Sequence, residues 1–136
     1  MIFQGTPLHA GTASGPTLVL TEPVSFWGAF DPREGKIVDV HHPQCGAKLA
    51  GHILLLPETR GSGGTPGGIA ESIRRRIGPL GIIMIAPDIN LAVGAAAATT
   101  LYQTDCPVIS VGPEAYLQLI KAKHVTIARD GKLTGD

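Results

Sequence analysis

The fold is decided by residues 53–85, "ILLLPETRGSGGTPGGIAESIRRRIGPLGIIMI". The two ends of this stretch, residues 53–56 and 82–85, are continuous apolar runs, typical of strands that are covered on both faces. Between them, isoleucine recurs at every fourth residue from Ile69 to Ile77, which gives one apolar stripe along a helix. The stretch therefore predicts a βαβ unit, with a glycine-rich loop where the first strand meets the helix.

Signals for helix boundaries support this unit and extend it toward the C-terminus. Thr65 is a residue type that caps a helix, Pro66 suits the first helical position, and Gly78 with Pro79 ends the helix. Asp88 can open a second helix in the same way. The remaining elements predicted in this half are helices at 88–101 and 113–122 and strands at 108–111 and 125–127, the last of these before a turn at 130–131.

The first half of the chain reads as β structure instead. Strands are predicted at residues 2–9, 17–20 and 37–40, and a turn is predicted at residues 31–35. No repeat, linker or low-complexity segment divides the chain. We therefore expect an α/β fold in a single domain over residues 1–136, β-rich in its N-terminal half and βαβ in its C-terminal half.

Composition excludes several classes of protein. Eleven acidic side chains balance eleven basic ones, whereas a nucleic-acid-binding domain carries a basic excess. The one basic run, at residues 74–76, reads as a solvated helix end. No basic segment precedes an apolar one at the N-terminus, and no apolar run approaches the roughly 20 residues of a membrane span. A cytoplasmic protein without membrane contact is expected.

The glycine-rich loop has two readings, a plain turn or a binding site. It leads into a helix N-terminus, where unpaired N–H groups and the helix dipole attract anions. It is not a phosphate-binding Walker A loop, because no Gly-Lys-Ser/Thr follows, and Pro66 breaks the dinucleotide-binding pattern of glycines. Arg60 stands where a nucleophile elbow around Ser62 would need glycine. We favour a serine held beside Arg60 and several amide donors.

Other polar clusters have simpler readings. The histidines and the cysteine at positions 41, 42, 45 and 52 complete no zinc-type spacing, so we expect no metal site in this chain. Because His41 and His42 point to opposite faces of an extended segment, one surface imidazole and one packed imidazole are predicted. Asp31 before Pro32 favours a turn, and Cys106 is expected to be a buried thiol. Phe26 and Trp27 form a core pair or an interface.

Taken together, the motifs of this chain resemble those of the small subunit of aconitase X. The likeness covers nearly the whole chain, although Ala29 and Thr59 replace residues that are usually glycine and Gly64–Thr65–Pro66 replaces a segment where serines are common. The motifs that carry it are Ser25-Phe26-Trp27-Gly28, Asp31-Pro32, Gly35, Ile37, Asp39, His42-Pro43, Gly46, Gly51, Arg60-Gly61-Ser62 and the Pro–Val–Ile segment at 107–109.

The resemblance implies a swivelling β/β/α three-layer domain and a hydro-lyase that is active only with a large subunit. It implies that the large subunit carries an iron or iron–sulfur centre, with no cofactor in this chain. By position, Ser62 would be the proton acceptor, with Arg60 stabilising its alkoxide or the substrate anion. Residues expected to bind substrate are Gly61, Gly63, Gly64 and Thr65, and residues expected at the subunit interface or pocket rim are Phe26, Trp27, Asp31 and His42.

The substrate expected from the resemblance is a small anionic hydroxy acid. The first candidate is cis-3-hydroxy-L-proline, which is dehydrated to Δ1-pyrroline-2-carboxylate. The alternative is (R)-5-phosphomevalonate of the mevalonate pathway. A function without catalysis, as an anion-binding or regulatory module, also remains open.

Overall fold

The computed structural model describes residues 1–22, 30–31, 33–37, 41–58 and 65–136. Its strands form one eight-stranded sheet and a separate two-stranded pair. The strands are β1 (Ile2–Gln4), β2 (Thr6–His9), β3 (Ala13–Val19), β4 (Phe30–Asp31), β5 (Lys36–Ile37), β6 (Ile53–Leu56), β7 (Gly81–Met84), β8 (Val108–Ser110), β9 (His124–Ile127) and β10 (Lys132–Gly135), and the helices are α1 (Thr65–Arg74), α2 (Ile89–Tyr102) and α3 (Pro113–Leu119).

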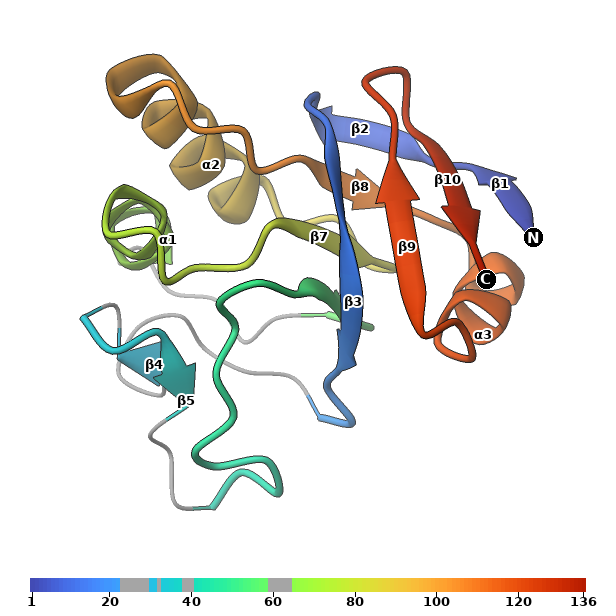
Figure 1. The fold of residues 1–136 in the computed structure, drawn as a ribbon, viewed down its shortest axis with the longest axis horizontal. Helices are drawn as coiled ribbons and strands as arrows, with labels where there is room; N and C mark the ends of the chain where they lie inside the picture. The colour runs from blue at the N-terminus through green and yellow to red at the C-terminus, as the bar shows by residue number, and fades with distance from the viewer. Residues whose placement is uncertain (23–29, 32, 38–40, 59–64) are drawn as a thin grey trace.

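The long sheet folds back on itself at two corners. Its strand order is β1-β10-β9-β3-β6-β7-β8-β2. Strand β3 pairs antiparallel with β9 through residues 13–16 and parallel with β6 through residues 17–19, so it passes from one half of the sheet to the other. At the second corner only Gly5 separates β1 from β2, and a Cβ there would collide with the Ile109 side chain. The two halves therefore face each other as two layers (Figure 1).

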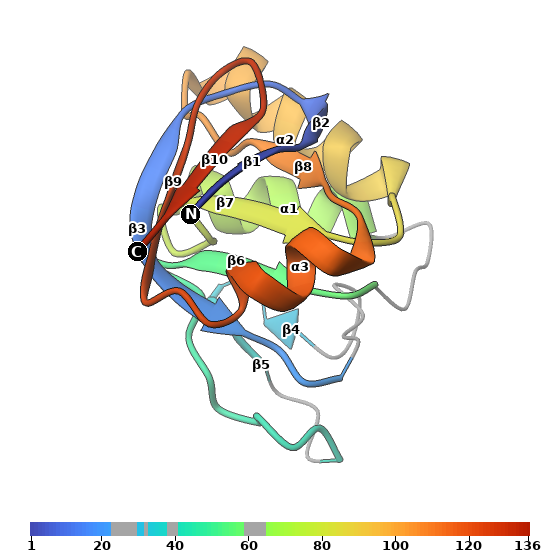
Figure 2. The ribbon, with the colours of Figure 1, turned by 90° about the vertical axis from the view of Figure 1, so that its right-hand side faces the viewer.

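Alternation along the central strands builds two hydrophobic cores. In β6, Leu54 and Leu56 point to the helices α1 and α2, whereas Ile53 and Leu55 point to the other half of the sheet. The first core adds Ile82 and Met84 of β7 together with apolar residues of both helices. Figure 2 shows the same layers from the side. The first layer is one half of the sheet, the second is the other half, and the third is helices α1 and α2. This order confirms the predicted β/β/α architecture.

The predicted C-terminal elements are largely confirmed. Strands β6, β7 and β8 and helices α1, α2 and α3 lie where the sequence placed them, within a few residues. Asp88 caps α2 as expected: its Oδ1 accepts a hydrogen bond from the Asn90 amide at 2.8 Å. Cys106 is a buried thiol of the first core, as predicted. Residues 74–76 are exposed, in keeping with a solvated helix end.

Three strand predictions were wrong. Residues 2–9 do not form one strand, because the chain turns at Gly5 between β1, which pairs with β10, and β2, which pairs with β8. The predicted strand at 125–127 is not the last one, because β10 follows and pairs with both β9 and β1. Leu133 is the only large apolar residue of β10, so its sequence gave little sign of a strand. Strand β3 begins at Ala13 instead of residue 17, because its Ser-Gly-Pro segment, which reads as a turn, is held by backbone pairing with β9.

None of the helices in the described ranges has the length and apolar character that crossing a membrane requires.

Candidate functional site

Four strand ends meet at one edge of the central sheet. The second half of β3 and strands β6, β7 and β8 are parallel neighbours, so their carboxyl ends lie together. The arrowheads of β6, β7 and β8 all point to the right in Figure 2. In sheets of this kind, ligands bind outside the carboxyl ends of the strands. We call this the carboxyl edge.

Both segments that the sequence singled out leave from the carboxyl edge. The Leu20 amide donates to the Leu55 carbonyl at 2.8 Å, so β3 and β6 stay side by side to their ends. Residue 22 then leads into 23–29, and Glu58 leads into 59–64. The Pro57 carbonyl accepts hydrogen bonds from the amides of Ile85 and Ala86, which joins this connection to the one after β7.

Most predicted site residues lie outside the described residues, so their roles stay predictions. These are Phe26, Trp27, Arg60, Gly61, Ser62, Gly63 and Gly64. Thr65 is described as the first residue of α1, one position earlier than the predicted start. Segment 59–64 therefore ends at the N-terminus of a ten-residue helix, whose dipole favours negative charge.

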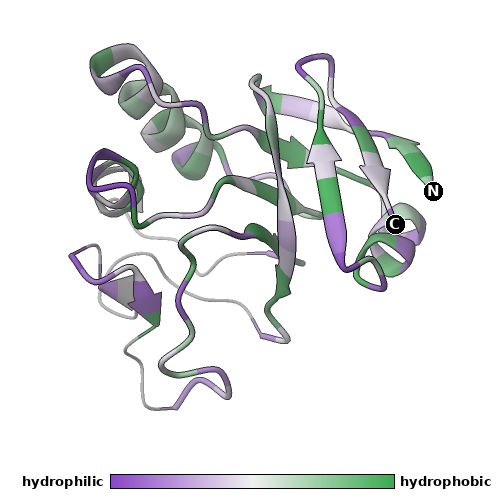
Figure 3. Cartoon of the chain, in the orientation of Figure 1, coloured by the Kyte–Doolittle hydropathy of each residue, from purple (hydrophilic) through white to green (hydrophobic). Residues whose placement is uncertain are grey.

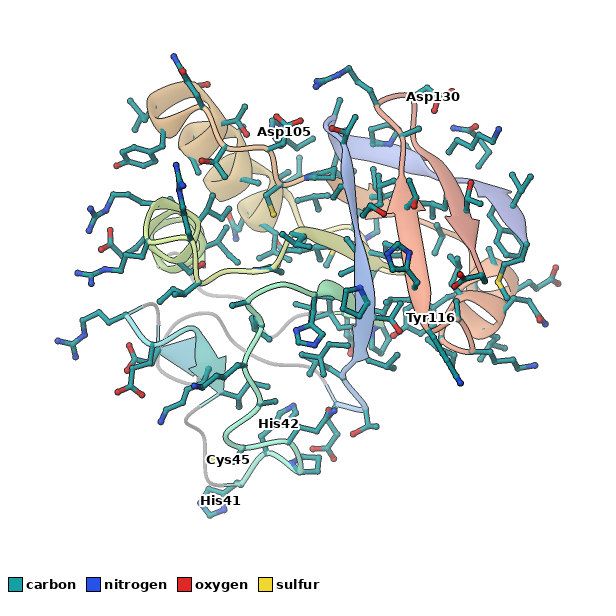
Figure 4. The ribbon with its side chains drawn as sticks, viewed as in Figure 1. His41, His42, Cys45, Asp105, Tyr116 and Asp130 are labelled. Atoms are coloured by element: carbon teal, nitrogen blue, oxygen red, sulfur yellow. The ribbon has the colours of Figure 1, made fainter. Side chains whose placement is uncertain are left out.

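His42 holds the chain in place just before residue 23. Its side chain is buried, with 6% exposed, while His41 is exposed, as the alternation predicted (Figure 4). The backbone N–H of Gln44 donates to Nδ1 of His42 at 3.0 Å, so Nδ1 carries no proton. The Nε2–H of His42 then donates to the Glu22 carbonyl at 3.1 Å. His42 thus holds Glu22 in place, and its expected role at the subunit interface or pocket rim stays a prediction.

Gln44 completes this arrangement, a role that its sequence does not predict. Its Nε2 donates to the Val19 carbonyl at 2.8 Å, and its Oε1 accepts from the Thr21 amide at 2.9 Å. The side-chain amide therefore extends the hydrogen bonding of β3 beyond the last paired residue. No spacing pattern marks such a residue, because its partners are backbone groups that are distant in sequence.

Asp31 has the turn role that its sequence predicted. Its Oδ1 accepts from the Arg33 amide at 2.8 Å, and its carbonyl accepts from the Gly35 amide at 2.7 Å. Gly35 has a φ of 69°, and a Cβ at this position would collide with the Ile77 carbonyl. The turn is therefore fitted against the end of α1, and the expected rim role of Asp31 stays a prediction.

The connections at the carboxyl edge have few charged side chains in their sequence. The connections that follow β3, β6, β7 and β8 are residues 20–29, 57–64, 85–88 and 111–112. Arg60 is the one lysine or arginine in the sequence of these segments. Glu22 and Glu58 are exposed acids, and Asp88 is engaged as a helix cap. An anion at this edge would therefore rely on Arg60 and on backbone N–H groups.

A groove of about 410 Å³ lies at the opposite, amino edge of the sheet. It contains the two non-glycine residues of positive φ in the described chain, Arg76 and Gln103, which follow the ends of α1 and α2. Asp105 at its wall accepts from the Thr12 amide at 3.1 Å and pairs with Arg129 at 3.2 Å (Figure 4). These contacts hold the fold together. The lining residues are Gly51, Ile73, Arg76, Gly78, Pro79, Leu80, Gln103, Thr104 and Asp105.

Metal ligands are not gathered in the part of the chain that the structure describes: no three side chains of histidine, cysteine, aspartate or glutamate form a cluster there. The thiol of Cys45 is exposed. Burial raises the pKa of the Cys106 thiol to about 12, so this group stays protonated and unreactive at neutral pH.

Comparison with known proteins places this architecture in a family. A family model for the aconitase X swivel domain matches residues 2–134. Cis-3-hydroxy-L-proline dehydratase of Pseudomonas aeruginosa is 36% identical over 126 residues, which cover 93% of this chain and 21% of that protein. The small subunit of phosphomevalonate dehydratase of Methanosarcina acetivorans is 31% identical over 135 residues, covering 89% and 92%. This chain thus spans about a fifth of the hydroxyproline dehydratase.

Solved structures agree in fold. The solution structure of a UPF0107 protein superposes with a TM-score of 0.84 at 27% identity, covering 100% of this chain and 99% of that one. The crystal structure of Thermococcus kodakaraensis aconitase X in its holo form gives a TM-score of 0.83 at 24% identity, covering 100% and 98%. With the family model and these relatives, the chain belongs to the aconitase X swivel domain family.

Proposed function

We propose that this chain is the small subunit of an aconitase X-type hydro-lyase in the cytoplasm and supplies a serine base to a pocket built with a large, iron-containing partner. One observation carries the proposal. Segments 23–29 and 59–64 leave adjacent parallel strands at the carboxyl edge, and segment 59–64 ends at the N-terminus of α1. This is the place in the fold where a bound anion is stabilised best.

Dehydration removes a proton from one carbon and a hydroxyl group from its neighbour. In this proposal, the oxygen of Ser62 accepts the proton. A serine hydroxyl is a weak base at its ordinary pKa, so the alkoxide must be stabilised by nearby positive charge. Arg60 and the amides that precede α1 are the groups in this chain that can do so. The partner's iron centre, when bound, would supply the Lewis acid for the departing hydroxyl group.

The first proposed substrate is cis-3-hydroxy-L-proline. Hydroxyproline dehydratases of Pseudomonas aeruginosa and Hypocrea jecorina match 93% and 92% of this chain.

Phosphomevalonate remains the second candidate because the chain is also similar to small subunits of phosphomevalonate dehydratase, among them that of Methanosarcina acetivorans, which is 31% identical over 135 residues.

The experiment is to co-express the chain with the large aconitase X chain of its own organism and to assay both substrates. We expect turnover of cis-3-hydroxy-L-proline by the complex and none by this chain alone. Turnover of phosphomevalonate instead would select the second candidate. Substantial turnover by the isolated chain, or none by the complex with either substrate, would contradict the proposal.

A further inference from the structure

Helix α2 carries no charged side chain. Residues 89–104 include no aspartate, glutamate, lysine or arginine. A helix of a water-soluble domain normally buries one face and shows charged side chains on the other. An uncharged outer face on a surface helix is typical of a helix that is covered by another protein.

The inner and outer faces of α2 are clearly separated. Leu91, Ala95 and Ala98 are fully buried in the core shared with α1 and the central sheet. Ile89, Val93 and Leu101 instead expose 69%, 52% and 68% of their surface. With the half-buried Ala97 they recur at every fourth position, and we call these four residues the α2 ridge. The helix has 14 residues, so the ridge extends along about 20 Å.

Helix α1 provides an internal comparison because it packs against the same face of the sheet. Its outer face carries an ion-pair network in which Glu71 binds both Arg74 and Arg75. Figure 3 shows hydrophilic colour along α1, whereas α2 is mostly neutral to hydrophobic beyond its first turn. One of the two helices is therefore built to face water, and its neighbour is not.

The position of the ridge indicates what covers it. Ile89 directly follows Asp88, the last residue of the connection after β7, so the ridge begins at the carboxyl edge and continues from it along α2. A partner that closes over that edge would meet Ile89 first. We infer that the α2 ridge is a docking surface for the large partner chain, which would present an uncharged, apolar strip to it. This inference rests on the proposed function.

The test is to place a charge on the ridge without disturbing the fold. Val93→Glu changes an exposed position and should leave the melting temperature of the chain nearly unchanged. It should raise the Kd for the large partner at least about tenfold, because the charge would be buried in the complex without a counterion. The matched control is Leu117→Glu on α3, another exposed apolar residue of a helix (56% exposed), which should bind as the wild type does.

Kinetics separate this inference from the proposed function. At saturating partner concentration Val93→Glu should regain the wild-type kcat, whereas Ser62→Ala should bind the partner normally and stay inactive. A Val93→Glu variant with wild-type Kd would overturn the docking surface while leaving the role of Ser62 intact. A wild-type chain that dimerises by itself, and becomes monomeric on Val93→Glu with no change in partner binding, would show that a second copy covers the ridge. A partner that fails to bind the wild-type chain would contradict both ideas.

Discussion

The two edges of the central parallel sheet differ in what their residues do. At the amino edge, Asp105 of the groove is used within the fold: it accepts a hydrogen bond from the Thr12 amide and pairs with Arg129. At the carboxyl edge, fixed groups such as His42 and Asp88 hold the starts of connections that carry further polar residues. Under the proposed function, the site lies where the parallel strands end, and the groove at the opposite edge serves only the fold.

The largest loss of activity is expected when Ser62 is replaced. Loss of a general base costs on the order of 10²- to 10⁴-fold in rate, so Ser62→Ala should lower kcat of the complex by that factor. The control is Ser110→Ala at the same edge, where the hydroxyl donates to the Ile85 carbonyl at 3.1 Å. Removing it should cost about 1 kcal/mol of stability and leave kcat unchanged. Equal kcat losses in Ser62→Ala and Ser110→Ala would contradict a specific catalytic role for Ser62.

A somewhat smaller effect is expected from the arginines of the two edges. Arg60→Gln should lower kcat/KM by roughly 10²- to 10³-fold, because its charge serves both the alkoxide and the substrate anion. Arg76→Gln, in the groove at the amino edge, should leave kcat and KM unchanged. Steady-state kinetics of both complexes make the comparison. A larger loss of kcat/KM from Arg76→Gln than from Arg60→Gln would place the site at the amino edge instead of the carboxyl edge.

Asp88 lies at the carboxyl edge but serves as a helix cap, so its replacement should affect stability and not catalysis. Asp88→Ala should lower the free energy of unfolding by about 1 kcal/mol, with little change in kcat. Asp88→Asn keeps an oxygen that accepts from the Asn90 amide and should retain most of the stability. Denaturant unfolding gives the free energies. If Asp88→Ala abolished activity in a stable complex, Asp88 would be a site residue.

The smallest effect is expected on the outer face of α1. Hydrogen bonds from Arg74 and Arg75 lower the pKa of Glu71 to about 2. A carboxyl whose folded-state pKa lies below its ordinary value of 4.5 stabilises the fold above that value, and the contribution is lost as pH falls toward 2. Because the pair is exposed, salt screens it. Glu71→Gln should lower the melting temperature slightly at pH 6 in low salt, and not at pH 2 or in 1 M salt.

Much of the fold was predictable because its central strands are continuous apolar runs. Residues 53–56 are buried on both faces, one set of side chains in each core, and a continuous apolar run is typical of a covered parallel strand. Strand β10 and the first half of β3 were not predictable, because their pairing depends on partners distant in sequence and their side chains include few large apolar groups. Local sequence patterns do not predict pairing with strands that are distant in sequence.

The candidate site was predictable to a different degree. The order of motifs in the chain identified the family and singled out Ser62 and Arg60. It did not reveal the hydrogen bonds that Gln44 makes to β3, because these join residues more than twenty positions apart. Nor did it reveal the α2 ridge, since exposure of Ile89 and Val93 follows from which side of α2 faces the sheet.

The most direct test of the central claim is exchange of the carbon-bound proton that dehydration removes. The wild-type complex and the Ser62→Ala complex are each saturated with cis-3-hydroxy-L-proline in deuterated water, and deuterium entering recovered substrate is followed by NMR. If Ser62 takes the proton, the wild type should exchange it reversibly and Ser62→Ala should lose exchange by the same factor as kcat, while calorimetry still detects substrate binding. Exchange by Ser62→Ala at the wild-type rate would contradict the assignment of Ser62 as the base.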